Sequence, residues 1–316
     1  MILLVTSKRD VTTDLIVQKL QTLRRPYFRL NTEDLPQGTL HGQPGAEWSL
    51  SLNGEAFKLS NVTAAYFRRP GMPEIRPSLP VNLQDFVLQE WQSALTGLYW
   101  VLEERWLNSP MNIALAENKI RQLILARSMG FTVPDTLIGN SAPAAAEFAD
   151  SRQCVAKPVK QNLIEGEGGG KVVFTSRIPR FTSENAAEIE ASPFILQQEI
   201  VKAFDIRVTV VGEKVFATAI DSQGNPDTEV DWRKTSNPTL PHEIYELPSV
   251  LVERCTALVR KLGLRYGAID LVLDNDGKHW FLEINPNGQW GWIEMRTGHP
   301  IAAAIVDELE AIGHGH

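Results

Sequence analysis

The chain has 316 residues, of which 43% are hydrophobic and 22% are charged, and its formal net charge at pH 7 is -7. This acidic balance disfavours a nucleic-acid partner, because phosphate backbones attract basic surfaces. No apolar run is long enough to cross a bilayer, and the first ten residues lack the long apolar stretch of a signal peptide, so we expect no membrane partner.

The two cysteines, Cys154 and Cys255, lie about a hundred residues apart, without a CxxC pair or a metal-type histidine spacing. This usage argues against a zinc site and against a disulfide framework, and it fits the cytoplasm, where we expect the protein to be located. A chain of this length exceeds what one hydrophobic core usually serves, so we expect several lobes around a cleft.

The first third of the chain has the pattern of an α/β domain. An apolar run at residues 2–6 predicts a strand, and the periodic stretch at residues 14–23 predicts a helix. Further strands are predicted at residues 27–30, 48–52, 56–59 and 64–68. We place the end of this N-terminal α/β domain, residues 1–110, near Ser109 and Pro110.

Two helical patterns follow. The first, at residues 83–105, has apolar side chains at three- and four-residue spacings, and this stripe is expected to pack inward. The second, at residues 114–129, leads to Gly130 and Pro134, which are typical of a helix end.

Strands and helices then alternate from residue 136 to the end. The order strand, helix, strand, glycine-rich loop, strand, helix and strand predicts a compact α+β unit, which we assign to residues 111–195. Strands at 206–211 and 214–220, a helix at 249–262, a final hairpin and a last helix form the third unit, residues 196–316.

The segment YGAIDLVLDNDGKHWFLEINPNG, residues 266–288, predicts a hairpin, because Asp276 and Gly277 are favoured in two-residue turns. If this turn pairs residue 275 with residue 278, Asp270 lies directly opposite Glu283, and Asn285 lies on the same face two residues further on. The Cβ atoms of such a pair are about 5 Å apart.

Two carboxylates that face each other repel unless a cation neutralises them. The three side chains Asp270, Glu283 and Asn285 offer only oxygen atoms, which favours magnesium, a metal that commonly bridges to substrate phosphates. The alternative is a carboxylate pair at a solvated face of the sheet.

A second candidate site is a glycine-rich loop with the sequence GEGGGK, which follows the strand that ends at Lys157. Glycine amides can close around anionic oxygens, and lysine side chains supply the charge that a phosphate needs. The residues of this candidate site are Gly166, Gly168, Gly169, Gly170, Lys157 and Lys119. An ordinary glycine hairpin and a surface lysine are the alternatives, and the spacing fits neither a Walker A loop nor a dinucleotide fingerprint.

A third candidate site lies where one strand ends and the next begins. The backbone of Gln198, Glu199 and Ile200 can hydrogen-bond an adenine, and Asp205 can reach a ribose hydroxyl. Two arginines in the same region, Arg207 and Arg233, can bind a phosphate or a carboxylate in a fork, and surface ion pairs are the alternative.

Four further residues have open roles. Arg68 and Arg69, beside Pro70, are candidates for contact with substrate or with a second subunit, or they cap a strand at the surface. Trp290 and Trp292 are candidates for a wall of the substrate site or for the core.

Taken in order, the motifs ENK, VAKP, the glycine loop, QQEI, DIR and AIDLVL…FLEINPNG resemble those of the ATP-grasp superfamily over residues 110–290. The DIR and NPN motifs resemble the branch that contains the ribosomal protein S6 glutamate ligase. The N-terminal part, FRRP, VDWR and EINPNGQWGWIE are most similar to the peptide maturases of the graspetide or microviridin type.

This resemblance implies a three-lobed ATP-grasp fold with an N-terminal α/β pre-ATP-grasp domain. It implies that Lys119, Lys157 and the glycine loop hold ATP phosphates, that residues 198–200 and Asp205 hold adenosine, and that Mg²⁺ binds to the three oxygen ligands named above. It further implies that the arginines at positions 207 and 233 are catalytic and stabilise an acyl-phosphate.

The implied activity is an ADP-forming ligase that makes ester or amide crosslinks between side chains of a ribosomal precursor peptide. A leader segment of the peptide would dock on the enzyme, which by analogy forms a homodimer. The alternative is a RimK-like or glutathione-synthetase-like ligase that joins a free amino acid or small carboxylate to another acceptor. A nucleotide sensor without catalytic activity is a third hypothesis, against which the cations and metal ligands argue.

Overall fold

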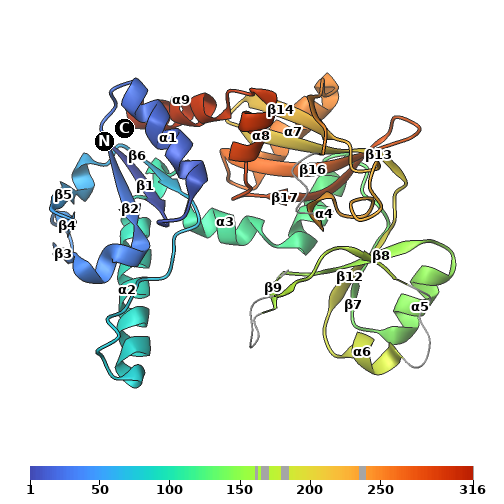
Figure 1. Ribbon diagram of the computed structural model, residues 1–316, viewed down its shortest axis with the longest axis horizontal. Coiled ribbons are helices and arrows are strands. Elements are labelled where there is room, and N and C mark those ends of the chain that lie inside the picture. The colour runs from blue at the N-terminus through green and yellow to red at the C-terminus, as the bar shows by residue number, and fades with distance from the viewer. Residues whose placement is uncertain (161–162, 165–170, 179–184, 235–239, 316) are drawn as a thin grey trace.

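The computed structural model describes residues 1–160, 163–164, 171–178, 185–234 and 240–315. These residues form an N-terminal α/β domain, a small antiparallel sheet with helices, and a larger five-stranded sheet with helices (Figure 1). The mixture of α/β and α+β units expected from the sequence is thus confirmed. In this described part no helix is both long enough and apolar enough to cross a membrane.

The N-terminal domain is built on a parallel sheet in the order β2-β1-β6. Its strands are β1 (Ile2–Thr6), β2 (Tyr27–Asn31) and β6 (Ala64–Phe67). Helix α1, Val11–Thr22, begins after Asp10, whose carboxylate accepts a hydrogen bond from the Thr12 amide at 3.2 Å. The last helix of the chain, α9 (Ile301–His314), packs against α1 and β6, so both chain ends lie in this domain (Figure 1).

A second, antiparallel sheet extends this domain. It contains β3 (Thr39–Gly42), which the sequence analysis missed, β4 (Trp48–Leu52) and β5 (Glu55–Lys58). Leu50 and Phe57 of this sheet pack in one core with Val5 and Leu30 of the parallel sheet.

The long helix α2, Val81–Val101, corrects one prediction. Only its C-terminal half packs inward, through Leu95, Leu98 and Tyr99. Its N-terminal half extends away from the body of the protein (Figure 1), and the Phe86 side chain is 58% exposed. The stripe predicted to be buried is therefore open at Leu83 and Phe86, whereas Leu88 and Trp91 further along it are partly buried.

The helix predicted at residues 114–129 is two helices. Helix α3, Pro110–Ala116, begins at Ser109, and helix α4 spans Lys119–Ser128. Asn118 caps α4, because its side-chain oxygen accepts a hydrogen bond from the Arg121 amide at 3.0 Å. This cap fixes Lys119 at the first turn of α4, where backbone amides are unpaired and favour anions.

The small sheet has the strand order β11-β8-β12-β7. Its elements are β7 (Thr136–Gly139), α5 (Ala142–Asp150), β8 (Cys154–Pro158), β11 (Ser176–Arg177), α6 (Ala186–Glu190) and β12 (Phe194–Gln198). A separate short hairpin is formed by β9 (Leu163–Ile164) and β10 (Lys171–Val172). The boundary proposed between residues 195 and 196 falls inside β12, so a boundary after Gln198 keeps this sheet whole.

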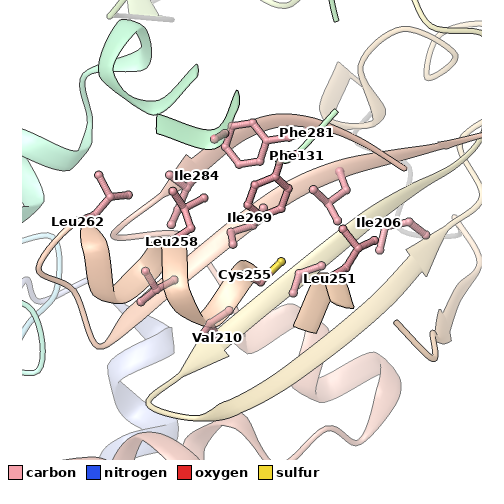
Figure 2. Packing of buried hydrophobic residues seen from close by; sticks show 14 of the residues in the cluster. Phe131, Ile206, Val210, Leu251, Cys255, Leu258, Leu262, Ile269, Phe281 and Ile284 are labelled. Atoms are coloured by element: carbon pink, nitrogen blue, oxygen red, sulfur yellow. The ribbon is translucent and has the colours of Figure 1, made fainter. Parts of the chain in front are cut away.

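The large sheet has the order β15-β14-β13-β16-β17. Its elements are β13 (Lys202–Val211), β14 (Lys214–Ile220), β15 (His242–Ile244), α7 (Ser249–Lys261), β16 (Tyr266–Asp274), β17 (His279–Asn285) and α8 (Gly291–Thr297). Helix α7 covers one face, where Cys255 and Leu258 meet Ile269 and Phe281 (Figure 2). This packed face makes the sheet a rigid base for the opposite face.

The hairpin of β16 and β17 has the predicted pairing at the candidate metal ligands, for a different reason. Asp270 lies opposite Glu283, but Leu271 pairs with Phe281 instead of Leu282, because a bulge separates the two pairs. The turn is also one residue longer than predicted. The Asp274 carbonyl accepts from the Gly277 amide at 3.2 Å, and the Asp274 amide donates to the Lys278 carbonyl at 3.0 Å. The longer turn and the bulge compensate each other, which restores the predicted register beyond the bulge.

Candidate active site

A cavity of about 650 Å³ lies between the small sheet and the open face of the large sheet. Strands β8, β12, β13, β16 and β17, the first turn of α4 and residues 229–233 all contribute to its walls. The described site residues predicted from the sequence line this cavity, namely Lys119, Lys157, Gln198, Glu199, Ile200, Asp205, Arg207, Arg233, Asp270, Glu283 and Asn285. The predicted glycines 166, 168, 169 and 170 lie outside the described residues.

The two facing carboxylates are neutralised by basic side chains. Glu283 is 3.3 Å from Lys119 Nζ and 3.4 Å from Arg233 Nη1, while Asp270 accepts from Arg207 Nη1 at 2.8 Å. Burial alone would raise the pKa of Glu283, but the positive charges around it hold that pKa well below its usual range. Glu283 is therefore ionised at neutral pH, as a carboxylate that binds a metal must be.

The predicted metal ligands offer a hard, oxygen-only donor set. Ala268 pairs with Asn285, so the Asn285 side chain is on the same face as Glu283, two residues away. Its oxygen also accepts a hydrogen bond from the Asn287 amide at 2.9 Å, which fixes the side chain. The described residues contain no cluster of three or more acidic, histidine or cysteine ligands. Two carboxylates and one amide suit Mg²⁺ when phosphate oxygens and waters complete its coordination.

Two lysines, from α4 and β8, line the cavity beside the carboxylates. Lys157, near the end of β8, donates to Gln197 Oε1 at 2.9 Å, and Lys119 donates to the Pro158 carbonyl at 3.3 Å. Burial lowers the pKa of Lys157 to about 8, although the charge of Glu283 opposes this effect. A buried cation of this kind gains charge stabilisation when an anionic ligand enters.

Arg233 is held in place by a residue that the sequence analysis did not single out. The buried carboxylate of Asp231 accepts from Arg233 Nε at 2.8 Å and from Nη2 at 3.0 Å. Burial lowers the pKa of Arg233, but the hydrogen bonds and charge of Asp231 outweigh it and the net pKa is raised. The fork of Arg233 is therefore pre-oriented, with its remaining nitrogen directed to Glu283.

The strand junction predicted to hold adenosine lines the cavity, but several of its groups already have partners. The amides of Gln198 and Glu199 donate to the carbonyls of Asp135 and Gln153, each at 2.8 Å. The Glu199 carboxylate pairs with Arg177 at 2.8 Å. An adenine at this junction is thus left with carbonyl groups and the Ile200 amide.

Asp205, the predicted ribose ligand, is a buried residue with 6% of its surface exposed. Its carboxylate pairs with Lys202 at 2.7 Å and accepts from Ser222 Oγ at 2.6 Å. Burial raises the pKa of Asp205, while Lys202 lowers it. Lys202 also lines the cavity and was missed, because its position at the start of β13 gives no sequence signal.

A second missed residue is Gln122 on α4, one turn after Lys119. Its side chain donates to the Ile284 carbonyl at 2.8 Å and accepts from the Ile284 amide at 3.0 Å. These two bonds join the edge strand β17 to α4 and so fix the backbone next to Glu283. Spacing within the helix, with Lys119 and Gln122 three residues apart, is the only sequence signal that could have indicated this role.

Comparisons with known proteins agree with this geometry. The model of the MvdD pre-ATP-grasp domain matches residues 1–114, and the model of the RimK-like ATP-grasp domain matches residues 116–309. A probable alpha-L-glutamate ligase of Pseudomonas aeruginosa is 28% identical over 221 residues, which are 66% of this chain and 68% of that protein. A probable alpha-L-glutamate ligase 1 of Shewanella baltica is 28% identical over 206 residues, 64% of this chain and 66% of that protein.

Two solved structures are similar over almost the whole chain. The macrocyclase MdnC of Microcystis aeruginosa, solved with its precursor peptide MdnA, has a TM-score of 0.84 and 27% identity, covering 98% of this chain and 99% of that one. A RiPP-associated ATP-grasp ligase of Chryseobacterium gregarium, solved with ADP and a leader and core peptide, has a TM-score of 0.88 and 25% identity, covering 98% and 96%. The chain therefore belongs to the RimK-like ATP-grasp ligases and has an N-terminal domain of the MvdD pre-ATP-grasp type.

Proposed function

We propose that this enzyme uses ATP to crosslink side chains of a ribosomally made precursor peptide through ester or amide bonds. The observation that supports this proposal most strongly is the N-terminal match. The MvdD-type domain occupies residues 1–114, and the similarity to two peptide-modifying ligases covers 98% of the chain. A glutamate ligase relative, in contrast, matches only 64% of the chain.

The proposed reaction has two steps. A side-chain carboxylate of the peptide attacks the γ-phosphate of ATP, which gives an acyl-phosphate and ADP. A hydroxyl or amine of the same peptide then attacks the activated carbonyl, phosphate leaves, and the peptide has lost one water for each bond formed. No protein nucleophile is needed, so the enzyme contributes alignment and charge stabilisation.

The residues of the cavity supply that stabilisation in our proposal. Lys119 and Lys157 neutralise the phosphates, and Arg233, held by Asp231, faces the transferred group. Asp270, Glu283 and Asn285 would hold Mg²⁺, which supplies charge neutralisation at the phosphate oxygens. Arg207, paired with Asp270 at 2.8 Å, keeps that carboxylate in place.

The lowered pKa of Lys157 predicts a pH dependence. The free enzyme loses the Lys157 proton near pH 8, whereas bound phosphates favour the charged lysine, so ATP binding takes up a proton above that pH. Between this pKa and the higher one of the complex, affinity falls by up to about tenfold for each pH unit. Calorimetry at pH 7 and pH 9, in buffers of different ionisation enthalpy, measures this uptake.

Lys157→Arg is the matched variant, because arginine stays charged over this range. Its ATP affinity is expected to depend less on pH, with little proton uptake at pH 9. Equal proton uptake by both proteins would assign the titration to another group.

A leader segment of the peptide and a second copy of the enzyme are the partners that we propose. The open stripe on α2 supports the homodimer, since a contiguous apolar face of this kind is uncommon on a monomer and a helix pair can be self-complementary. Leu83 and Phe86, three residues apart on this face, are 43% and 58% exposed. The cytoplasmic location that we propose fits two free, buried cysteines.

Phe86→Glu tests this interface. The introduced charges would face each other across the helix pair, so the variant is expected to be monomeric in light scattering while the wild type is a dimer. Phe86→Leu is the control, because it keeps the apolar surface. A dimer that persists in the glutamate variant would place the interface elsewhere.

The glutamate-ligase activity remains the second candidate, supported by the 28% identity to the probable alpha-L-glutamate ligases. Measuring ADP release with each substrate distinguishes the peptide-crosslinking activity from the glutamate-ligase activity. With Mg²⁺ and ATP, a precursor peptide encoded beside this gene is expected to stimulate ADP release, and free L-glutamate is expected to leave it unchanged. Stimulation by glutamate alone would favour the second candidate.

A further inference from the structure

The loop after β17, residues 286–289, joins the N-terminal domain to the active site. Arg68, just after β6, donates through Nη1 to the Asn287 carbonyl and, at 3.0 Å, to Asn287 Oδ1. Arg207 donates to the Gln289 carbonyl at 3.3 Å, and the Tyr266 hydroxyl donates to the Gly288 carbonyl at 2.8 Å. One short segment thus connects the end of β6 with the strands that bear the facing carboxylates.

This junction has more donors than acceptors. Arg68 is 1% exposed, yet its Nε and Nη2 have no hydrogen-bond partner among the described residues, and Arg207 Nε has none either. The nearest carboxylate, Asp10, is 3.9 Å from Arg68 Nε. Buried guanidinium groups without acceptors are costly, so the surroundings of this junction favour an anion.

Arg69 is the next residue, and its backbone is held in an unusual conformation. Its φ of 45° is positive, and residues other than glycine adopt positive φ at a cost in free energy. The preceding amide, of Arg68, donates to the Val5 carbonyl at 2.8 Å, and Thr32 Oγ1 donates to the Gly71 carbonyl at 2.6 Å. Hydrogen bonds on both sides therefore keep the Arg69 backbone in this conformation, and they fix the position from which its side chain extends.

The Arg69 guanidinium has no hydrogen bond or ion pair with any described residue, although it is near other charges. Burial lowers its pKa first, and the positive charges of Arg68 and Arg207 lower it further. Its own charge acts on Glu117, a residue that lines the active-site cavity. Arg69 is an exposed residue, and its charge interacts with Arg68 and Arg207 of the junction and with Glu117 of the cavity wall.

The other arginines of the site are already committed to partners. Arg207 pairs with Asp270, and Arg233 is held in a fork by Asp231. A substrate carboxylate needs a planar pair of donors, which an unpaired guanidinium offers in the matching geometry. In addition, Arg69 follows the carboxyl end of a parallel strand, the edge at which α/β sheets usually bind ligands.

We propose that Arg69 binds the side-chain carboxylate that the enzyme activates, with Arg68 as the positioning residue that fixes Arg69 against the active-site loop. This inference rests on the proposed function and adds the residue that recognises the carboxylate. The negative charge of the substrate would offset the repulsion among Arg68, Arg69 and Arg207, so recognition of the substrate also completes the charge balance of the site.

The test uses a small probe, N-acetyl-L-glutamic acid amide, whose only carboxylate is on the side chain. Its line broadening in NMR spectra is followed as the intact enzyme is added, with ADP and Mg²⁺ present. The wild type is expected to bind the probe and to ignore the uncharged N-acetyl-L-glutamine amide. Arg69→Ala is expected to bind the acidic probe at least about tenfold more weakly, while ADP affinity stays the same.

Two further variants separate charge from backbone effects. Arg69→Lys keeps the charge without the fork, so intermediate binding is expected. Arg24→Ala is the matched control, because Arg24 also has a positive φ, 53°, but lies in the turn between α1 and β2. This control is expected to bind the probe as the wild type does.

Several results would overturn the proposal. One is equal binding of the probe by Arg69→Ala and the wild type, and another is a loss of ADP affinity in place of probe affinity, which would make Arg69 a phosphate ligand. A wild type that binds ADP but not the probe would also exclude this carboxylate site. Failure to bind ADP at all would instead contradict the proposed function.

Discussion

Glu283→Gln is expected to reduce turnover by at least about a hundredfold while the enzyme still binds nucleotide. Glu283 is central in the site, since its two oxygens face Lys119 and Arg233 at 3.3 and 3.4 Å, and it lies opposite Asp270. The amide retains the shape of the side chain but removes the charge. The proposed metal ligand and the counter-charge of the cations are thereby lost together.

The same variant is expected to change nucleotide binding in a specific way. With Glu283 neutral, the positive charges of Lys119, Lys157 and Arg233 lose one counter-charge, so ATP without Mg²⁺ should bind as tightly as before or more tightly. Isothermal titration with and without Mg²⁺ measures this. Glu213→Gln is the control, because Glu213 pairs with Arg260 on the surface. Full turnover in the Glu283 variant would remove the metal-site assignment.

The largest loss of stability is expected for Trp290→Ala. Trp290 is completely buried in the core that joins α1, α9 and the large sheet, and its Nε1 donates to the Tyr66 hydroxyl at 3.2 Å. Removal of so large a side chain leaves a cavity and an unpaired hydroxyl, at a cost of about 3–5 kcal/mol in the free energy of unfolding. Trp290 therefore belongs to the core, the alternative that the sequence left open.

Urea unfolding followed by circular dichroism measures this loss. Trp292→Ala is the matched control, because Trp292 is only partly buried and packs against Trp232 at a ring-centroid distance of 5.2 Å. It is expected to shift the unfolding midpoint much less. Equal shifts for the two variants would mean that the Trp290 site collapses after truncation.

The facing carboxylates show how far the sequence can predict the site. A two-residue turn predicted that Asp270 lies opposite Glu283, and the structure has this pair because two departures from that prediction cancel. The turn geometry was not predictable, because Asp274 binds residue 278 and Gly277 adopts a positive φ of 80° to close a longer loop. Local sequence gave no sign of the bulge that compensates for this longer loop.

Tertiary packing, which local sequence does not reveal, accounts for most of what was missed. The ion pair between Lys202 and Asp205 depends on the burial of both side chains, which follows from the packing of the sheet. The hydrogen bonds from Gln122 to Ile284 join two elements across a separation of 162 residues in the sequence. Periodicity reports which face of an element is apolar, but it does not report which element lies opposite.

The exposed half of α2 illustrates the same limit. An apolar stripe at three- and four-residue spacing predicts burial, yet Phe86 is 58% exposed in the single chain. The pattern indicates a surface that packs against a partner. In our proposal this partner is a second copy of the chain and not another element of the same chain.

Peptide mass is the most direct measure of the central claim. The enzyme is incubated with ATP, Mg²⁺ and a precursor peptide encoded beside its gene, and the product is compared with the peptide treated with Glu283→Gln. We expect the wild type to remove one water from the peptide for each ADP released and the variant to leave the mass unchanged. ADP release with an unchanged peptide mass, or a peptide mass increased by an added amino acid, would contradict the account.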